Sequence, residues 1–190
     1  AYGGWAGSGE IDIMEAVNLK AKSDETGAAS DQEESRVHGT LHYGRAWPDN
    51  VYSGKGFHLP GGVNPADDFH EYAVEWQEGE IRWYVDDIHF ATQRDTGWYS
   101  QYMNDDGLLI DGAGSAPFDQ KFHLLLNFAV GGNWSAMVND KGIDESVFPQ
   151  SLEIDYVKVY ECTVSPQTGA GCEAIGDEAA LVAGKQAPAL

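Results

Sequence analysis

The most informative segment of this chain is GEIDIMEAVN, residues 9–18. It carries three carboxylates, Glu10, Asp12 and Glu15, with apolar residues between them. Isoleucine favours β-strands, and side chains on a strand alternate between its two faces, so Glu10 and Asp12 should share one face. Strict alternation would send Glu15 to the apolar face, where an unpaired carboxylate is costly. We therefore predict a β-bulge near Met14 that returns Glu15 to the face of the other two acids.

Three acids on one strand face repel one another, and stability alone does not favour this arrangement. Like charges so close raise the pKa of at least one carboxyl group, which can then keep its proton near neutral pH. Retaining glycoside hydrolysis uses such a pair, because one carboxylate attacks the sugar carbon while the other protonates the leaving oxygen. A solvated edge strand is the structural alternative for a bare E-x-D pattern. The full pattern, with Gly9 before it and Trp5 upstream, favours a catalytic strand.

The segment GGWAGSGEIDIMEAVN, residues 3–18, resembles the active-site strand of glycoside hydrolase family 16, in its bulge-containing laminarinase-like branch. The resemblance implies that Glu10 is the nucleophile and Glu15 the acid/base, while Asp12 supports the nucleophile and tunes its charge. It covers nearly all of residues 2–161, in the family's order. The segments that continue it are HGTLHYG (38–44), DFHEYAVEW (68–76), IRWYVDD (81–87), LLLNFAVGGNW (124–134) and IDYVKVY (154–160).

Short alternating or apolar runs separated by Gly, Asp and Asn clusters indicate a nearly all-β chain. Their spacing fits a two-sheet sandwich, and the resemblance implies a β-jelly-roll of the concanavalin A-like type with a concave catalytic face. Residues 78–79 and 86–87 should form tight hairpin turns. Residues 20–34 should form a surface loop, and 95–119 a loop with a short helical turn. We predict strands near 9–17, 35–44, 69–77, 80–86, 88–93, 120–130 and 151–161.

The composition changes after residue 161. Residues 1–161 should form one catalytic domain, which we expect to lack the N-terminal strands that family members carry before the motif. Residues 162–190 contain no aromatic side chain and should form a C-terminal loop and linker. In an exported protein, Cys162 and Cys172 would close a small loop, and we favour this disulfide over two free thiols. The expected location is accordingly secreted, periplasmic or at the cell surface.

Four side chains are candidate substrate-binding residues. In RVHGTLHYG, His42 shares one strand face with His38 and Thr40, and the resemblance favours a place for it in the cleft over a structural role. No third ligand accompanies the two histidines, so a zinc site is not favoured. Asn127 interrupts an apolar run, and a buried asparagine needs partners, which a sugar hydroxyl or a neighbouring backbone group could supply. Trp5 and Trp134 resemble cleft aromatics of the family.

The other tryptophans have less distinctive settings. Aromatic faces can stack on the apolar faces of sugar rings, but aromatic side chains also dominate protein cores. Trp47 and Trp98 lie in polar or Gly-containing loops and are candidates for the rim of the cleft. Trp76 and Trp83 lie within predicted hairpin strands, where we expect them to belong to the core.

The strongly negative net charge of the chain limits the classes of molecule that it can bind. The chain has 11 Lys and Arg against 31 Asp and Glu, a formal net charge of −20, which argues against nucleic acid or an anionic membrane. No apolar run approaches the roughly 18 residues of a membrane-spanning helix. A neutral polysaccharide is compatible with this charge, and we expect a monomer. The resemblance implies a structural calcium at Asp155, whose N-terminal carbonyl partners have no counterpart here, and no cofactor in the chemistry.

We therefore expect a retaining endo-β-1,3-glucanase that hydrolyses laminarin-like glucans by double displacement. The first alternative is another substrate within the same family, either mixed-linkage β-1,3-1,4-glucan or an agar-type galactan. The second is a non-catalytic carbohydrate-binding module on the same sandwich. The presence of Glu10, Asp12 and Glu15 argues against the binding module, because binding alone does not require clustered acids.

Overall fold

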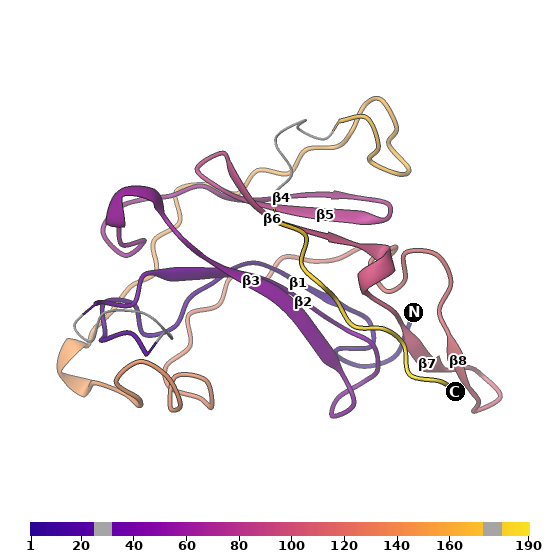
Figure 1. The fold of residues 1–190 in the computed structure, drawn as a ribbon, viewed down its shortest axis with the longest axis horizontal. Helices are drawn as coiled ribbons and strands as arrows, with labels where there is room; N and C mark the ends of the chain where they lie inside the picture. The colour runs from indigo at the N-terminus through magenta and orange to yellow at the C-terminus, as the bar shows by residue number, and fades with distance from the viewer. Residues whose placement is uncertain (25–31, 173–179) are drawn as a thin grey trace.

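A computed structural model describes residues 1–24, 32–172 and 180–190. Two three-stranded antiparallel sheets lie one over the other, with strand orders β1-β2-β3 and β4-β5-β6 (Figure 1). A two-stranded sheet, β7-β8, lies at one end. The strands are β1 (Glu10–Glu15), β2 (Arg36–Tyr43), β3 (Val51–His58), β4 (Tyr72–Gln77), β5 (Glu80–Val85), β6 (Ile88–Arg94), β7 (Gln101–Met103) and β8 (Leu109–Asp111). Three short 3-10 helices cover Pro60–Gly62, Asp95–Gly97 and Glu145–Val147.

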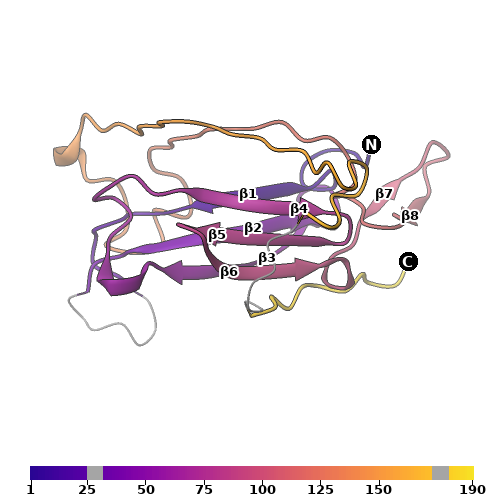
Figure 2. The same cartoon turned by 90° about the horizontal axis from the view of Figure 1, so that it is seen from above.

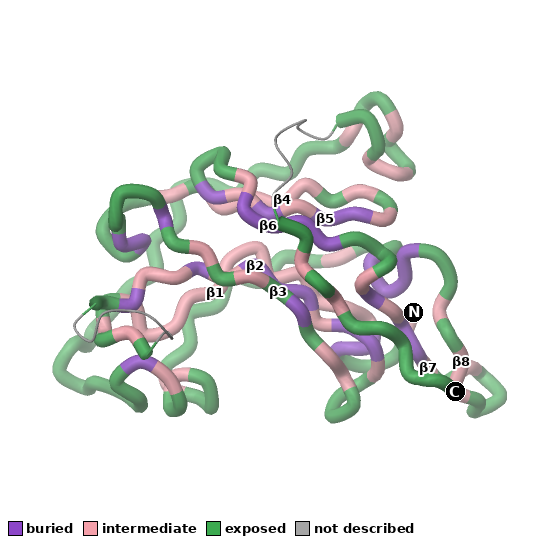
Figure 3. Tube along the Cα trace, in the orientation of Figure 1, coloured by how far each residue is buried: buried purple, intermediate pink, exposed green. Residues whose placement is uncertain are grey.

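The hydrophobic core consists mainly of apolar side chains from the two three-stranded sheets. Alternate residues of β2 and β5 are fully buried, among them Leu41 and Trp83 (Figure 3). Gly39 allows close packing at this point, because a Cβ atom there would lie 2.7 Å from Cγ of Trp83. The other members of the cluster are Val37, Tyr43, Leu59, Ile81, Val85, Phe90, Ala91, Trp98 and Phe118.

Both predicted hairpin turns are confirmed. Glu78 and Gly79 join β4 to β5, with Gln77 paired to Glu80, and Gly79 adopts the positive φ of 80° that this turn requires. Asp86 and Asp87 join β5 to β6, and both have a positive φ, which is the pattern of a type I′ turn. The five predicted strands that lie between residues 9 and 93 are present, with ends shifted by at most three residues.

The strands predicted at 120–130 and 151–161 were wrong. Both segments lack strand structure, and most of their apolar side chains are exposed. Figure 2 shows the chain between β8 and the C-terminal region running beside the edge formed by β1 and β4 without joining either sheet. Within the described residues, β1 pairs only with β2, and β4 pairs only with β5. Apolar alternation gives a segment strand propensity, but a strand forms only when its backbone pairs with a neighbour.

Three strands were not predicted. β3 contains Gly54 and Gly56, and glycine within a strand weakens the sequence signal. β7 and β8 are three residues each and lie inside the segment predicted as a loop, where the expected helical turn is the 3-10 helix Asp95–Gly97. The loop predicted at 20–34 lies partly outside the described residues.

The C-terminal region combines a disulfide with an extended segment. Cys162 and Cys172 form the predicted disulfide. The segment 181–188, here called the C-terminal strap, begins beside β6, where Val182 N donates to Thr92 O at 2.9 Å. It then reaches β2, because Lys185 N donates to the Tyr43 hydroxyl at 2.9 Å, and β7, because Gln101 Nε2 donates to Pro188 O at 2.8 Å. In the part of the chain that the structure describes, no helix is long and apolar enough to span a bilayer.

Candidate active site

The predicted bulge in β1 is confirmed by the register of β1 against β2. Glu10 pairs with His42 and Asp12 with Thr40, but Glu15 pairs with His38. β1 therefore advances three residues while β2 advances two, which is the one-residue excess of a bulge. Glu10, Asp12 and Glu15 consequently lie opposite the alternating row His42, Thr40, His38 and share its face of the sheet.

The core holds the bulge in place from behind. Trp83, fully buried on β5, donates its indole N–H to the backbone carbonyl of Asp12 at 2.9 Å. Ile11 and Met14, on either side of this carbonyl, pack against the core cluster. The carboxylates therefore stand on a strand whose opposite face is fixed by packing and by a hydrogen bond between the two sheets. Such support limits the movement of catalytic side chains.

The environment of the acids raises two pKa values. Burial, reinforced by the negative charges of Glu15 and Glu10 and by a hydrogen bond to Glu10, raises the pKa of Asp12 to about 8. Burial also raises the pKa of Glu15, although a hydrogen bond with the Thr40 side chain and the nearby His42 act in the opposite direction. The expected proton retention near neutral pH is therefore present, but desolvation contributes more to it than like-charge repulsion.

Trp5 and His42 lie beside the acids. Trp5 donates its indole N–H to Oε2 of Glu10, and its ring centroid lies 5.7 Å from that of His42. His42 Nε2 is 3.4 Å from Oδ2 of Asp12. Among the described residues, Asp12, Glu15 and His42 form the one group of three potential metal-ligand side chains, with donor atoms within 4.8 Å of one another. The sequence pattern did not show that the two acids would lie this close to His42.

Trp134 lies at the other end of the β2 row, with its ring centroid 5.4 Å from that of His38. The loop 132–142, which carries this tryptophan, is held by an interaction that the sequence analysis missed. The Asn18 side-chain amide contacts the carbonyl oxygens of Ser135 at 3.0 Å, Val138 at 3.0 Å and Asn139 at 3.1 Å. An asparagine shortly after β1 is a weak sequence signal, because its partners lie about 120 residues further along the chain.

Asn139 completes the attachment of this loop. Its side chain is almost fully buried, and its Oδ1 accepts a hydrogen bond from Asp24 N at 3.1 Å. In return, Asn139 N donates to the Asp24 carboxylate at 3.3 Å. The two asparagines therefore fix the loop 132–142 to the segment that follows β1, and with it the position of Trp134.

Asn127 and Asp155 lie on exposed segments without regular secondary structure. The expected burial of Asn127 was wrong, because the predicted strand around it does not form. Asp155 belongs to no group of three described His, Cys, Asp or Glu side chains that could share a metal ion. A calcium ion takes six to eight oxygen ligands, backbone carbonyls included, so the calcium at Asp155 stays a prediction.

Two of the four remaining tryptophan predictions were wrong. Trp98 was expected at the rim, but its side chain is 6% exposed and donates its indole N–H to Ser115 O at 3.3 Å. Trp76 was expected in the core, but it is 38% exposed at the sheet edge. Trp83 is buried in the core, as predicted, and Trp47 is exposed in the loop between β2 and β3.

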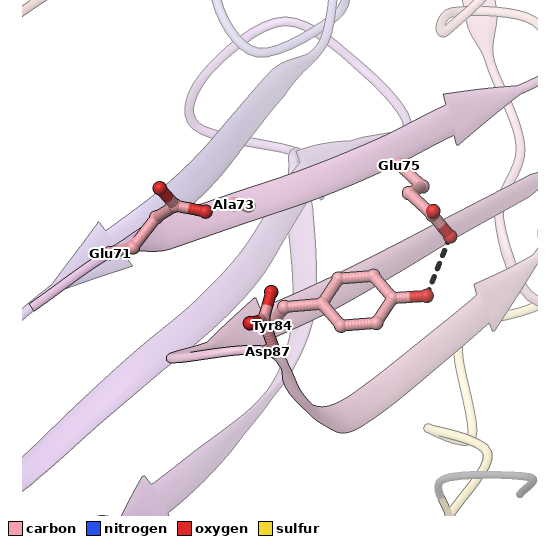
Figure 4. Close-up of a pocket in the computed structure, with 5 residues that line it drawn as sticks. All are labelled: Glu71, Ala73, Glu75, Tyr84 and Asp87. Atoms are coloured by element: carbon pink, nitrogen blue, oxygen red, sulfur yellow. Dashed lines mark hydrogen bonds between the residues drawn. The ribbon is translucent and has the colours of Figure 1, made fainter. Parts of the chain in front are cut away.

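A shallow pocket of about 230 Å³ lies away from these residues (Figure 4). It is formed on β4 and the β5–β6 hairpin by Glu71, Ala73, Glu75, Tyr84 and Asp87. Tyr84 donates its hydroxyl to Glu75 at 2.6 Å across the pocket. Arg82 and Tyr84 alternate with the buried residues of β5, so the pocket is on the face of this sheet that points away from the core.

Comparison with known proteins places this site in a family. The family model for glycosyl hydrolases family 16 matches residues 7–106, which include the three acids and both three-stranded sheets. The chain is 38% identical to glucan endo-1,3-beta-glucosidase A1 of Niallia circulans, over 84% of this chain and 20% of that protein. It is 35% identical to a beta-glucanase of Rhodothermus marinus, over 82% of this chain and 46% of that protein.

A third relative is named for binding a glucan and not for hydrolysing one. The chain is 39% identical to a beta-1,3-glucan-binding protein of Penaeus monodon, over 69% of this chain and 35% of that protein. In each comparison the chain spans less than half of the relative's length. The antiparallel sandwich, the bulged strand with its three acids and the family match agree: the chain belongs to glycosyl hydrolase family 16.

Proposed function

We propose that this chain is the catalytic part of a retaining endo-β-1,3-glucanase acting on laminarin-like glucans. The observation that carries the proposal is the bulge, which brings Glu10, Asp12 and Glu15 onto one sheet face. The raised pKa values of Asp12 and Glu15 support it, because a retaining mechanism needs one carboxyl group protonated while another is ionised. The choice of a β-1,3-linked substrate is supported by the names of two relatives, both of which refer to β-1,3-glucan.

In the first step, the Glu10 carboxylate attacks the anomeric carbon and forms an ester bond to the sugar. The glycosidic C–O bond breaks, and Glu15 gives its proton to the leaving oxygen. In the second step, Glu15, now a carboxylate, takes a proton from water as the water oxygen attacks the same carbon. The ester bond to Glu10 breaks, and the second inversion restores the β configuration.

Trp5 and Asp12 assist Glu10 in this scheme. Each makes a side-chain hydrogen bond with the Glu10 carboxylate. These contacts hold the nucleophile in one orientation. A protonated Asp12 donates to Glu10, so it holds the nucleophile without adding a second negative charge next to it.

Proton NMR of laminarin during digestion tests the proposal. We expect the first new anomeric signal to belong to the β-anomer and to convert later to the equilibrium mixture. An α-anomer as first product would contradict retention. Glu10→Gln should abolish turnover and leave the circular dichroism spectrum unchanged. Residual activity above a few per cent of wild type would contradict the role of Glu10 as nucleophile.

A non-catalytic glucan-binding module is the second candidate, favoured by the similarity to the Penaeus monodon protein. The binding module predicts measurable affinity for laminarin and no new anomeric signal with any β-glucan. Digestion of mixed-linkage β-1,3-1,4-glucan or agarose in parallel identifies the substrate within the family. A β-1,3-glucanase should release reducing ends faster from laminarin than from either of these.

The remaining proposals concern the oligomeric state, cofactor need, binding partner and cellular location of the protein. We propose a monomer whose chemistry needs no cofactor, because two carboxyl groups and water account for both steps. A neutral polysaccharide is the proposed partner, since a net charge of −20 disfavours nucleic acid and anionic lipid surfaces. The disulfide Cys162–Cys172 supports a secreted, periplasmic or cell-surface location.

A further inference from the structure

Tyr52, on β3, stands on the same sheet face as the acids and was not singled out in the sequence. β2 pairs with both neighbours, so that Glu10 lies opposite His42 and His42 lies opposite Tyr52. These three residues form one row across β1, β2 and β3. Neighbouring strands are about 4.8 Å apart, so the row extends about 10 Å from the proposed nucleophile to β3.

The aromatic rings along this row follow one another closely. The ring centroids of Trp5 and His42 are 5.7 Å apart, and those of His42 and Tyr52 are also 5.7 Å apart. The interplanar angles are 41° and 37°, so each ring is tilted moderately against the next. Trp5 and Tyr52 are 51% and 65% exposed, which leaves ring surface at both ends of the series open to solvent.

The middle of this face of β3 carries little side-chain bulk. The next positions that alternate with Tyr52 are Gly54, opposite Thr40, and Gly56, opposite His38. Both glycines are exposed. Tyr52 is therefore the one large side chain among positions 52, 54 and 56, and a ligand that crosses β2 near Glu10 meets its ring next.

We propose that Tyr52 forms a sugar-binding subsite, in which its ring stacks against the apolar face of a pyranose unit one or more positions away from the bond that is cleaved. This inference rests on the proposed function and extends it to a longer stretch of the polysaccharide. A cross-strand aromatic pair can also serve the sheet alone, by contacts between His42 and Tyr52. The two roles differ in one respect: a subsite affects only ligands long enough to reach it.

The test measures the binding of glucose oligomers to protein variants that all carry Glu10→Gln, so that the oligomers are not hydrolysed. Calorimetry compares β-1,3-linked glucose oligomers from the disaccharide to the hexasaccharide. We expect Tyr52→Ala to weaken hexasaccharide binding about tenfold, equivalent to about 1.4 kcal/mol, and to leave disaccharide binding unchanged. Tyr52→Phe should bind like the parent, because stacking needs the ring and not the hydroxyl. Tyr160→Ala, which removes an 85% exposed tyrosine outside the sheets, is the matched control and should also bind like the parent.

The outcomes separate the subsite from the proposed function. An equal loss for every oligomer, or no loss with the hexasaccharide, overturns the subsite while the parent still binds glucan. A thermal unfolding midpoint that falls in Tyr52→Ala without a length-dependent loss of affinity assigns the residue to sheet stability and also overturns it. A folded parent that binds neither these oligomers nor agarose oligomers overturns both the subsite and the proposed function.

Discussion

Asp12 shows at the scale of a residue how position changes the chemistry of a carboxyl group. Its backbone carbonyl accepts a hydrogen bond from Trp83 of the opposite sheet. Its side chain interacts with the carboxylates of Glu10 and Glu15. Desolvation and two negative neighbours favour the protonated form, so the pKa rises to about 8. The Asp12 side chain is therefore mostly protonated below about pH 8, and this depends on burial that the strand pattern alone does not reveal.

This shift predicts how stability depends on pH. Because the pKa of Asp12 is about 8 in the folded chain and near 3.8 when unfolded, the folded state binds the extra proton between these values. The contribution of Asp12 to the free energy of unfolding should therefore fall as pH rises from about 4 to about 8. Asp12→Asn removes this titration, so its stability relative to wild type should be at least about 1 kcal/mol more favourable at pH 8 than at pH 4. Urea denaturation of both chains at the two pH values measures the difference, and an equal difference at both would contradict the prediction.

At the scale of elements, the contact between β2 and β5 supports β1 from behind. Gly39 on β2 leaves room for the Trp83 ring, whose indole N–H reaches the Asp12 carbonyl. One residue without a side chain thus permits both close sheet packing and the hydrogen bond that holds the bulge. The arrangement predicts that β2 is sensitive to added volume at this position.

Gly39→Ala should destabilise the fold. A Cβ atom would lie 2.7 Å from Trp83 Cγ, so either the ring or the strand has to move. Such overpacking costs about 1–3 kcal/mol, and moving the ring should also lower activity. Thermal and urea unfolding measure the loss. Gly4→Ala is the control, because no atom lies within 4 Å of its Cβ position, and it should change stability by less than about 0.5 kcal/mol. Equal stability of the two variants would argue against a tight contact at Gly39.

The loop 132–142 is the second element whose placement decides the site. Asn18 has a φ of 47°, a backbone conformation that asparagine and glycine tolerate. Asn18→Gly therefore removes the amide without straining the backbone. It should free the loop and displace Trp134 from the site. We expect KM for laminarin to rise about tenfold with less than about a twofold change in kcat, because a binding contact is lost while the acids stay in place.

Steady-state kinetics on laminarin check this loop prediction. Asn104→Gly is a matched control, since it removes an asparagine side chain that bonds only within the turn between β7 and β8. It should leave KM unchanged. A fall in kcat of Asn18→Gly with unchanged KM would contradict a role in placing Trp134.

At the scale of the whole molecule, the C-terminal strap joins parts of the chain that are distant in sequence. It bonds to β6, β2 and β7, and therefore to all three sheets. Gly184 lies against Gly97, where a Cβ atom would come within 2.7 Å of the Gly97 Cα. The C-terminal strap is therefore held against the folded body at this end.

Gly184→Ala should detach the C-terminal strap. The added methyl group meets backbone, which cannot rotate away as a flexible side chain can. We expect a loss of about 1–3 kcal/mol in the free energy of unfolding and faster proteolysis near residue 185. Ala187→Gly, at an exposed strap position, serves as control. Unchanged proteolysis of Gly184→Ala would show that the strap contributes little to the folded body.

Local sequence was enough to predict the bulge in β1 and two hairpin turns. Three acids separated by apolar residues required a bulge, and the turn residues at 78–79 and 86–87 determined two hairpins, because these effects act over a few neighbouring residues. Which strands and side chains meet across long sequence separations depended on the tertiary structure. It left 120–130 and 151–161 outside the sheets, buried Trp98 and exposed Trp76. It also brought Asn18 to the Trp134 loop and Tyr52 to His42, since burial and pairing depend on neighbours that no local pattern specifies.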